Sequence, residues 1–247
     1  MTYLLELSYS GAAYSGFQIQ NNAKTVAGEL TRASKLLFGL PCKIQGCSRT
    51  DAGVHARQFF ASVHVPDGGN LVPTDRIPDA MNCLLPYDIA IKNAETVREG
   101  YNPRFETSYK EYEYVIYNRP EKDPFSHKLK LPYKYRLDEA MLDAEARDYI
   151  GEHDFKSFMA TGSDVVSTVR TVYSASVRRE GDDVIFSVCA DGFLYNMVRI
   201  MTGTLLCISE GKLGKGSIPA IIDAKNRTAA GITVPPDGLY LSRVALK

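Results

Sequence analysis

The stretch "GCSRTDAGVHA", residues 46–56, holds the densest group of reactive side chains in the sequence. Asp51 follows Arg49 by two residues, a spacing that in a turn can direct both side chains the same way. A carboxylate beside a guanidinium stays ionised and oriented through charge-assisted hydrogen bonds. Such carboxylates act as nucleophiles at the anomeric carbon of sugars. The pair therefore indicates a candidate catalytic site, and the alternative is that Asp51 only caps the turn through an Asx hydrogen bond.

Metal chemistry is not expected at this stretch. His55 lies four residues after Asp51, but that spacing brings two ligands together only on a helix, and Gly53 argues against a helix here. We expect His55 to be a hydrogen-bonded loop residue. The remaining histidines are scattered, and the five cysteines (Cys42, Cys47, Cys83, Cys189, Cys207) form no CxxC pair. The sequence therefore predicts reduced thiols and no metal site.

The composition limits the class of protein. The 247 residues include 29 Lys or Arg and 29 Asp or Glu, so the formal net charge is zero. This balance argues against nucleic-acid binding by bulk charge alone, although a basic groove offset by an acidic face elsewhere stays possible. Neither a run of apolar residues long enough to span a bilayer nor a secretory signal is evident, so we expect a cytoplasmic protein with no membrane partner.

The elements that would position residues 46–56 can be read from periodicity and capping signals. Extended segments are predicted before and after the motif, at 42–45 and 57–65. Thr25 is a candidate N-cap for a helix that continues to about Leu40. The other elements expected in this part of the chain are strands at 2–10, 88–97 and 105–118 and a short helix at 74–86.

A similar mixture of elements follows after residue 136. Asp138 is a candidate N-cap for a helix at about 138–150, and residues 180–182 carry a hairpin signal. The other elements expected there are helices at 194–209 and 217–226 and a strand at 238–246. Residues 119–136, with three prolines and many charges, are interpreted as a linker. The sequence thus predicts an α+β protein with halves at 1–118 and 137–247.

The motif also resembles a known family. "SRTDAGVHA" is similar to the signature loop of the tRNA pseudouridine synthase A family. Further blocks resemble family blocks in the family's order: "GFQIQ" (16–20), "PRFETSYKEYEYVIYN" (103–118), "HDFKSF" (153–158), "TVRTVY" (168–173), "DGFLYNMVRIMTGTL" (191–205) and "KNRTAAGITVPPDGLYLSRV" (225–244). The resemblance implies two similar halves, each a mainly antiparallel sheet with helices on one face, and an active-site cleft between them.

The resemblance of these blocks also implies the reaction, which is the isomerisation of uridines at tRNA positions 38, 39 and 40 to pseudouridine. These uridines lie on the 3′ side of the anticodon stem and loop. By the same resemblance, no cofactor is needed and a homodimer binds the tRNA. Two alternatives stay open: a nucleoside or glycoside hydrolase that uses the same aspartate, and a non-catalytic RNA-binding module.

Four residues receive catalytic roles from the family match. The match implies that Asp51 is the nucleophile, that Arg49 helps to hold the target nucleotide outside the helix, and that Tyr112 is the active-site tyrosine. It also implies that Arg199 pairs with Asp51. Arg199 is the sole charge within 194–209, where a buried guanidinium needs a carboxylate partner, although a snorkelling arginine is the alternative. Alternation alone places Tyr112 on the side of Tyr114, where a core tyrosine is the common outcome.

Further residues are candidates for substrate binding. Beside Arg49 and Tyr112, the set expected to contact RNA is Phe17, Gln18, Arg57, Lys110 and Leu239. Weaker candidates for the same groove are Lys24, Arg104, Arg170 and Arg178, each of which could equally be a solvated surface residue.

Overall fold

The computed structural model describes residues 1–162 and 165–247, and these form two compact units. The first unit comprises Met1–Ser108 together with Leu241–Lys247, and the second comprises Tyr109–Tyr240. These bounds differ from the division expected at 118 and 137. The reason is that the last residues of the chain return to the first unit, while most of the strand expected at 105–118 belongs to the second.

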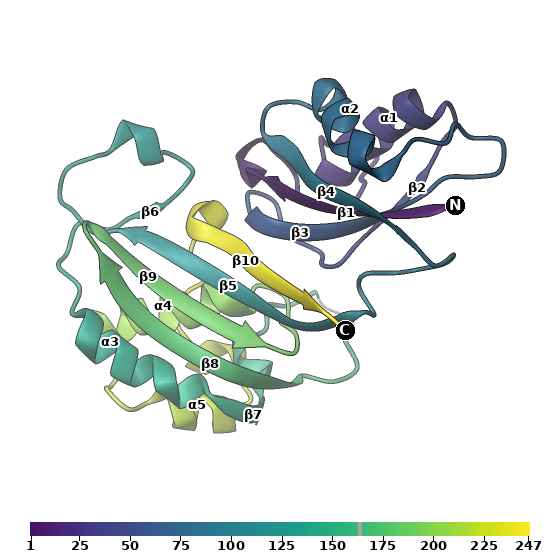
Figure 1. Ribbon diagram of the computed structural model, residues 1–247. Coiled ribbons are helices and arrows are strands. Elements are labelled where there is room, and N and C mark those ends of the chain that lie inside the picture. Colours follow the sequence, from purple (N-terminus) through teal and green to yellow (C-terminus); the bar gives the residue numbers. More distant parts are fainter. Residues whose placement is uncertain (163–164) are drawn as a thin grey trace. The chain divides into compact units, whose positions relative to one another are not determined.

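The first unit is an antiparallel sheet with two helices over one face (Figure 1). Its central strand β1 (Thr2–Tyr9) pairs with β3 (His55–His64) and with β4 (Ile89–Val97). A short strand, β2 (Lys43–Gly46), also pairs with β3, and β10 (Leu239–Leu246) lies beside β3. The helices are α1 (Val26–Phe38) and α2 (Ile77–Leu84).

The start of α1 confirms the predicted N-cap, whereas the helix ends at Phe38, two residues before the expected end at about Leu40. The Thr25 hydroxyl accepts a hydrogen bond from the backbone N–H of Gly28, and Thr25 itself is extended, as an N-cap residue should be. Gly39 ends the helix with φ of 79°, a left-handed conformation that costs glycine little. Helix α1 therefore begins and ends where local chemistry satisfies its free backbone groups.

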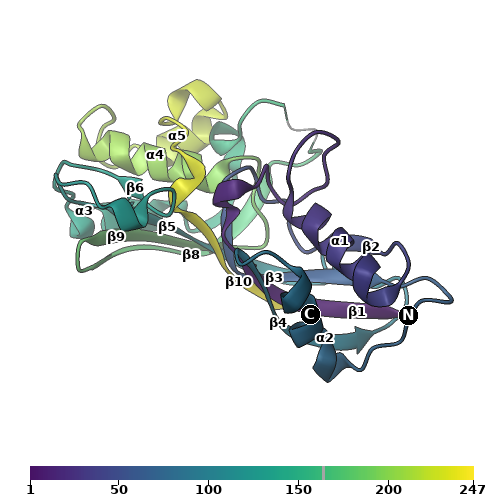
Figure 2. The same cartoon turned by 90° about the horizontal axis from the view of Figure 1, so that it is seen from above.

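The second unit is also mainly antiparallel. Its strands follow the order β5 (Thr107–Tyr117), β9 (Asp183–Ala190), β8 (Val169–Glu180), β7 (Gly151–Asp154). Two helices, α4 (Met197–Ser209) and α5 (Ile218–Ala224), cover one face of this sheet (Figure 2). Helix α3 (Glu139–Ala146) begins at Asp138, whose side chain accepts from the Met141 N–H as predicted, and it packs along β8. The expected α+β class, with mainly antiparallel strands, is confirmed.

Residues 119–136 are part of the second unit. They contain a 3₁₀ turn, η3 (Pro124–Ser126), and a short strand, β6 (Leu131–Pro132), that pairs in parallel with β5. The side-chain amide of Asn118 donates to the carbonyls of Tyr133 and Tyr135 at 2.9 and 2.7 Å. These bonds tie both ends of the segment to the sheet, which is why it does not behave as the linker interpreted from its prolines and charges.

Among the residues that the structure describes, no helix has both the length and the apolar character needed to cross a membrane.

Candidate active site

The motif loop joins β2 to β3 and is anchored at its start by the sheet. The backbone N–H of Cys47 donates to the carbonyl of Phe60 at 2.8 Å, and the N–H of Phe60 donates to the Cys47 sulfur at 3.3 Å. Because Cys47 is fully buried, these bonds form away from water. The loop thus leaves the sheet from a fixed point just before Ser48 and Arg49.

A second loop, residues 11–24, packs directly on the motif loop. The Phe17 N–H donates to the carbonyl of Thr50 at 3.1 Å, and the Gly53 N–H donates to the carbonyl of Tyr14 at 3.1 Å. Gly16 has φ of 92°, and a Cβ on it would lie 2.6 Å from the Thr50 oxygen. Only glycine permits this approach, so "GFQIQ" and the motif are two parts of one braced structure.

Buried side chains complete the bracing. The hydroxyls of Tyr9 and Thr50 are hydrogen-bonded at 2.7 Å. His55 is 1% exposed, and its Nδ1 accepts from the Gly11 N–H at 3.1 Å. An accepting Nδ1 places the ring proton of the neutral imidazole on Nε2. His55 is therefore hydrogen-bonded as predicted, but it is the first residue of β3 and not a loop residue.

This bracing presents Asp51 and Arg49 between rigid neighbours. Asp51 is partly buried, and its own carbonyl accepts from the Val54 N–H at 3.2 Å to close the turn. The Arg49 side chain is exposed. Arg104 lies close enough to Arg49 that, after partial desolvation, the positive charge of Arg49 also lowers the pKa of the Arg104 guanidinium. Two cations beside one loop create a positive potential suited to a phosphate.

The structure places Phe17 in the core, not on a surface that could contact RNA. Its ring is 3% exposed and stacks on Phe59 with centroids 4.4 Å apart. Gly46 packs on this ring, because a Cβ there would lie 2.4 Å from a Phe17 carbon. The aromatic residue of "GFQIQ" thus supports the loop from beneath, whereas Gln18 and Arg57 are exposed.

Arg199 lies in the first turn of α4 in the second unit. Its Nε donates to the carbonyl of Val234 at 2.7 Å, and its Nη1 donates to Oδ1 of Asn196 at 2.6 Å. Asn196 has φ of 59° and ψ of 13°, and its side chain makes no capping bond to the helix. Two bonds therefore hold the guanidinium in one orientation and, within residues 1–162 and 165–247, leave its other N–H groups for another acceptor.

Helix α4 can reach Val234 because glycines face each other at the crossing. A Cβ on Gly203 would lie 1.9 Å from the carbonyl oxygen of Ile232, and one on Gly231 would lie 2.6 Å from the Thr204 Cα. The Gly231 N–H donates to the Thr204 hydroxyl at 2.9 Å. This close contact sets the position of the 231–234 segment, and with it the carbonyl that orients Arg199.

The other predicted site residues of the second unit lie on strands β5 and β10. Tyr112 is 7% exposed and meets Phe193 edge to face, with centroids 5.0 Å apart. Tyr114 donates to the Pro235 carbonyl at 2.6 Å, and burial raises its pKa well above the ordinary value, while the charge of Arg199 opposes that rise. Leu239 is 5% exposed, and Lys110 is partly buried.

Several supporting residues were not found from the sequence. Tyr9 and Gly11 act across 41 and 44 residues of chain, so no local pattern indicates them. Asn196 did carry a local signal, because asparagine before an apolar helical run is typical of a helix start and tolerates positive φ. The predicted start of this helix at 194 was three residues early, since Asn196 in the left-handed region stops the helix there.

All five cysteines are free thiols. Within residues 1–162 and 165–247, no group of three or more His, Cys, Asp or Glu side chains is arranged to hold a metal ion.

Comparison with known proteins gives a consistent result. The sequence model of a family described as "tRNA pseudouridine synthase" matches residues 146–245. A tRNA pseudouridine synthase A from Caldicellulosiruptor bescii is 40% identical over 238 residues, which are 96% of this chain and 96% of that protein. One from Ruminiclostridium cellulolyticum is 42% identical over 241 residues, or 97% of each chain. At this identity over nearly the whole length, the chain belongs to the tRNA pseudouridine synthase A family.

Proposed function

We propose that this protein is a tRNA pseudouridine synthase, an isomerase that converts uridine to pseudouridine within tRNA. The proposal rests on membership of the family, whose relatives carry that name over nearly the full length of the chain. The reaction is an isomerisation: the bond between N1 and C1′ breaks, the uracil rotates while it is held, and C5 bonds to C1′. C5 then loses a proton and N1 carries one, so the product has the same atoms as the substrate.

Asp51 is the proposed nucleophile. The observation that carries this assignment is the bracing of its loop: Thr50 is bonded on both its hydroxyl and its carbonyl, and Gly53 is bonded to a neighbouring loop. A carboxylate on such a loop does not need to be ordered when the substrate binds. The carboxylate adds to the ribose or to the base of an everted uridine as the N1–C1′ bond breaks. The bond that it forms breaks again when C5 bonds to C1′, so Asp51 is regenerated.

Arg199 and Tyr112 are proposed to complete the site. In the part of the chain that the structure describes, Arg199 keeps free N–H groups after its bonds to Val234 and Asn196, and these are suited to a carboxylate or a phosphate. The proposed partner of Arg199 is Asp51. Tyr112, edge to face with Phe193, offers an aromatic surface for the uracil and a hydroxyl for proton transfer.

The proposed targets are uridines on the 3′ side of the anticodon stem and loop. A base in a stem must leave the stack before any side chain can reach its ribose. Arg49, with Arg104 beside it, supplies the positive charge that would hold the displaced nucleotide through its phosphate. Gln18, Arg57 and Lys110 are proposed as further contacts with the RNA. A homodimer in the cytoplasm is the proposed working form.

Mapping of pseudouridine tests this function. An unmodified tRNA transcript is incubated with purified protein and no added cofactor, and pseudouridine is located by chemical labelling and primer extension. We expect pseudouridine on the 3′ side of the anticodon stem and loop, with no free uracil. Release of uracil would instead identify a hydrolase, and binding of tRNA without any isomerisation would identify a non-catalytic RNA-binding module.

A further inference from the structure

The 119–136 segment concentrates positive charge in a chain whose formal net charge is zero. Its eighteen residues include six Lys or Arg and two acidic residues, whereas the whole chain balances 29 against 29. Five of the six cations are exposed: Arg119, Lys122, Lys128, Lys134 and Arg136. The segment lies beyond the end of β5 and returns to it as β6 (Figure 1). None of its side chains has a part in the proposed isomerisation.

The tip of the segment is built by a network of hydrogen bonds. Asp123 accepts from the Phe125 N–H at 3.0 Å and from the Ser126 hydroxyl at 2.5 Å. The Ser126 carbonyl accepts from the Leu129 N–H at 2.9 Å, and the Leu129 carbonyl accepts from the Tyr240 hydroxyl at 2.7 Å. The tip is therefore pinned both to itself and to the rest of the second unit.

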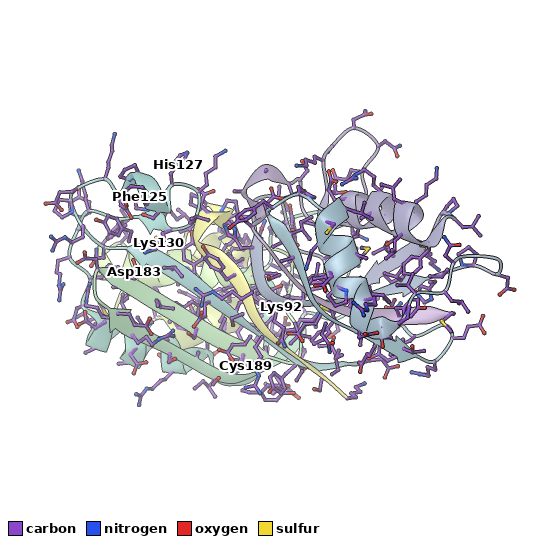
Figure 3. The ribbon with its side chains drawn as sticks, turned by 45° about the horizontal axis from the view of Figure 1, so that its top comes forward. Lys92, Phe125, His127, Lys130, Asp183 and Cys189 are labelled. Atoms are coloured by element: carbon purple, nitrogen blue, oxygen red, sulfur yellow. The ribbon has the colours of Figure 1, made fainter. Side chains whose placement is uncertain are left out.

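The base of the segment is fixed as well. Lys130 pairs with Asp183 at 2.7 Å, and β6 adds its hydrogen bonds to β5. Figure 3 shows Lys130 and Asp183 nearer the sheet, with Phe125 and His127 farther out at the tip. Lys130 thus holds the base of the loop, and it is distinct in role from the lysines at the tip.

This framework holds an aromatic ring and two cations out in water. Phe125 is 90% exposed, and its backbone N–H is held by the Asp123 carboxylate. Lys128 has φ of 59°, a conformation that residues with a Cβ rarely adopt. Lys122 and Lys128 pair with no carboxylate within residues 1–162 and 165–247. Strained backbone conformations are destabilising, and they cluster at functional surfaces.

We propose that the tip of the 119–136 segment is a contact surface for RNA. Phe125 stacks on an unpaired base, and Lys122 and Lys128 contact the phosphates on either side of it. Aromatic rings between cations are the usual means of binding single-stranded nucleic acid, because every base has a face to stack and every nucleotide has a charge. This inference rests on the proposed function, and it adds an RNA contact outside the residues assigned to the reaction.

The same features fit other partners less well. Anchoring to an anionic membrane typically uses cations clustered beside a membrane-spanning helix or along an amphipathic helix, whereas this segment is a loop with one 3₁₀ turn and the short strand β6. A protein partner would require an apolar patch with a polar rim, whereas Phe125 is a single ring among charges. The exposed neighbour His127 also stacks well on a base.

The test measures the dissociation constant of unmodified tRNA over a series of salt concentrations. Phe125→Ala should weaken binding about fivefold or more, as the loss of one stacked base does. The double variant Lys122→Gln/Lys128→Asn removes both charges, and asparagine tolerates the backbone of position 128. It should reduce the slope of log K against log salt by about 1.5, because two phosphate contacts are lost. Single-turnover rates at saturating tRNA should stay unchanged.

Matched controls use exposed residues outside the segment. Tyr87→Ala removes an aromatic side chain that is fully exposed in the first unit, and Lys35→Gln/Lys215→Gln removes two exposed cations. Both should bind tRNA like the unaltered protein. Circular dichroism and thermal unfolding of every variant ensure that a weaker affinity is not a loss of fold.

Four results would overturn the inference. The first is an unchanged tRNA affinity and salt slope in both tip variants, and the second is an equal loss of tRNA affinity in the control variants. The third is a change of oligomeric state, measured by sedimentation, in Phe125→Ala. The fourth is a tip variant that loses affinity for phosphatidylserine vesicles while its tRNA binding stays intact. If the unaltered protein neither binds tRNA nor forms pseudouridine, the proposed function itself fails. If the unaltered protein forms pseudouridine and the tip variants bind tRNA as tightly as it does, only the inference about the tip fails.

Discussion

Asn196 accepts a hydrogen bond from Arg199 through its side chain while its backbone adopts the left-handed conformation at the start of α4. The Oδ1 to Nη1 distance is 2.6 Å, and φ of Asn196 is 59°. With this backbone conformation, the Asn196 amide makes no capping bond to the start of α4 and instead contacts Arg199, three residues later. Asn196 is therefore a positioning residue for the guanidinium of Arg199, the proposed partner of Asp51.

Asn196→Gly should lower kcat while leaving KM for tRNA nearly unchanged. Glycine accepts the same backbone conformation, so the variant removes only the amide acceptor. A hydrogen bond to a charged group contributes about 1.5–3 kcal/mol, so we expect a fall in kcat of about tenfold or more. Steady-state kinetics on a tRNA transcript give both constants.

Asn196→Asp serves as the matched variant, because a carboxylate oxygen can accept the same bond from Arg199. It should retain more activity than Asn196→Gly. Equal kcat values for the glycine variant and the unaltered protein would show that Arg199 needs no help from Asn196.

Asp51→Asn should abolish the formation of pseudouridine while the fold and the affinity for tRNA persist. The amide has nearly the shape of the carboxylate but is not a nucleophile, so we expect the rate to fall by at least about 10³-fold. Pseudouridine mapping and a binding assay test the two halves of this prediction. Asp67→Asn, an exposed position in the same unit, is the control and should keep full activity. Substantial activity in Asp51→Asn would remove Asp51 from the mechanism.

Gly203→Ala should destabilise the protein. The new methyl carbon would lie 1.9 Å from the Ile232 carbonyl, so the 231–234 segment must move away from α4. Overpacking of this kind typically costs about 1–3 kcal/mol in the free energy of unfolding, and the shift would also move the carbonyl that holds Arg199. Urea unfolding measures the loss. Gly214→Ala is the matched control, since no atom lies near its added carbon, and equal stabilities for the two variants would contradict the packing argument.

The Asp154 carboxylate should make stability depend on acid pH. A hydrogen bond from Thr168 is the main cause that lowers its pKa, with Lys225 and the Lys156 N–H contributing. A group whose pKa is lower in the folded state stabilises the protein above its unfolded pKa of about 3.9, and this stabilisation is lost as pH falls. Thr168→Val should therefore be less stable than the unaltered protein at pH 7, with the difference shrinking between about pH 5 and 3.

Urea titrations at several pH values measure that difference. Asp154→Asn cannot titrate at this position and should show the flattest dependence of the three proteins over the same range. Parallel curves for the unaltered protein and Thr168→Val would exclude Asp154 as a source of acid sensitivity.

Local chemistry was sufficient to predict most of the elements. Thr25 caps α1, Asp138 caps α3, and Gly181 with φ of 59° closes the hairpin between β8 and β9. Each of these signals acts within a few residues, through a capping oxygen or a glycine turn, so it can be read without knowing the fold. The α+β class follows from the order of the elements.

The prediction was weaker where a segment depends on distant partners. Residues 119–136 contain the prolines and charges of a linker, but bonds from Asn118 and pairing with β5 make them part of the second unit. Phe17 was expected at the RNA surface, and its stacking on Phe59, 42 residues away, buries it instead. Neither partner is visible from the local pattern.

In the candidate site, too, some features could be predicted from the sequence and others could not. The sequence by itself determined the candidate reactive residues, since the types and spacing of Arg49 and Asp51 are typical of a nucleophile and the family resemblance adds Tyr112 and Arg199 as candidates. Only the tertiary structure decided how they are held: Thr50 by Tyr9, Gly53 by Tyr14, and Arg199 by Val234. The physical reason is that a hydrogen bond between residues tens of positions apart exists only after packing has brought them together, whereas a side chain's chemistry is present in its type.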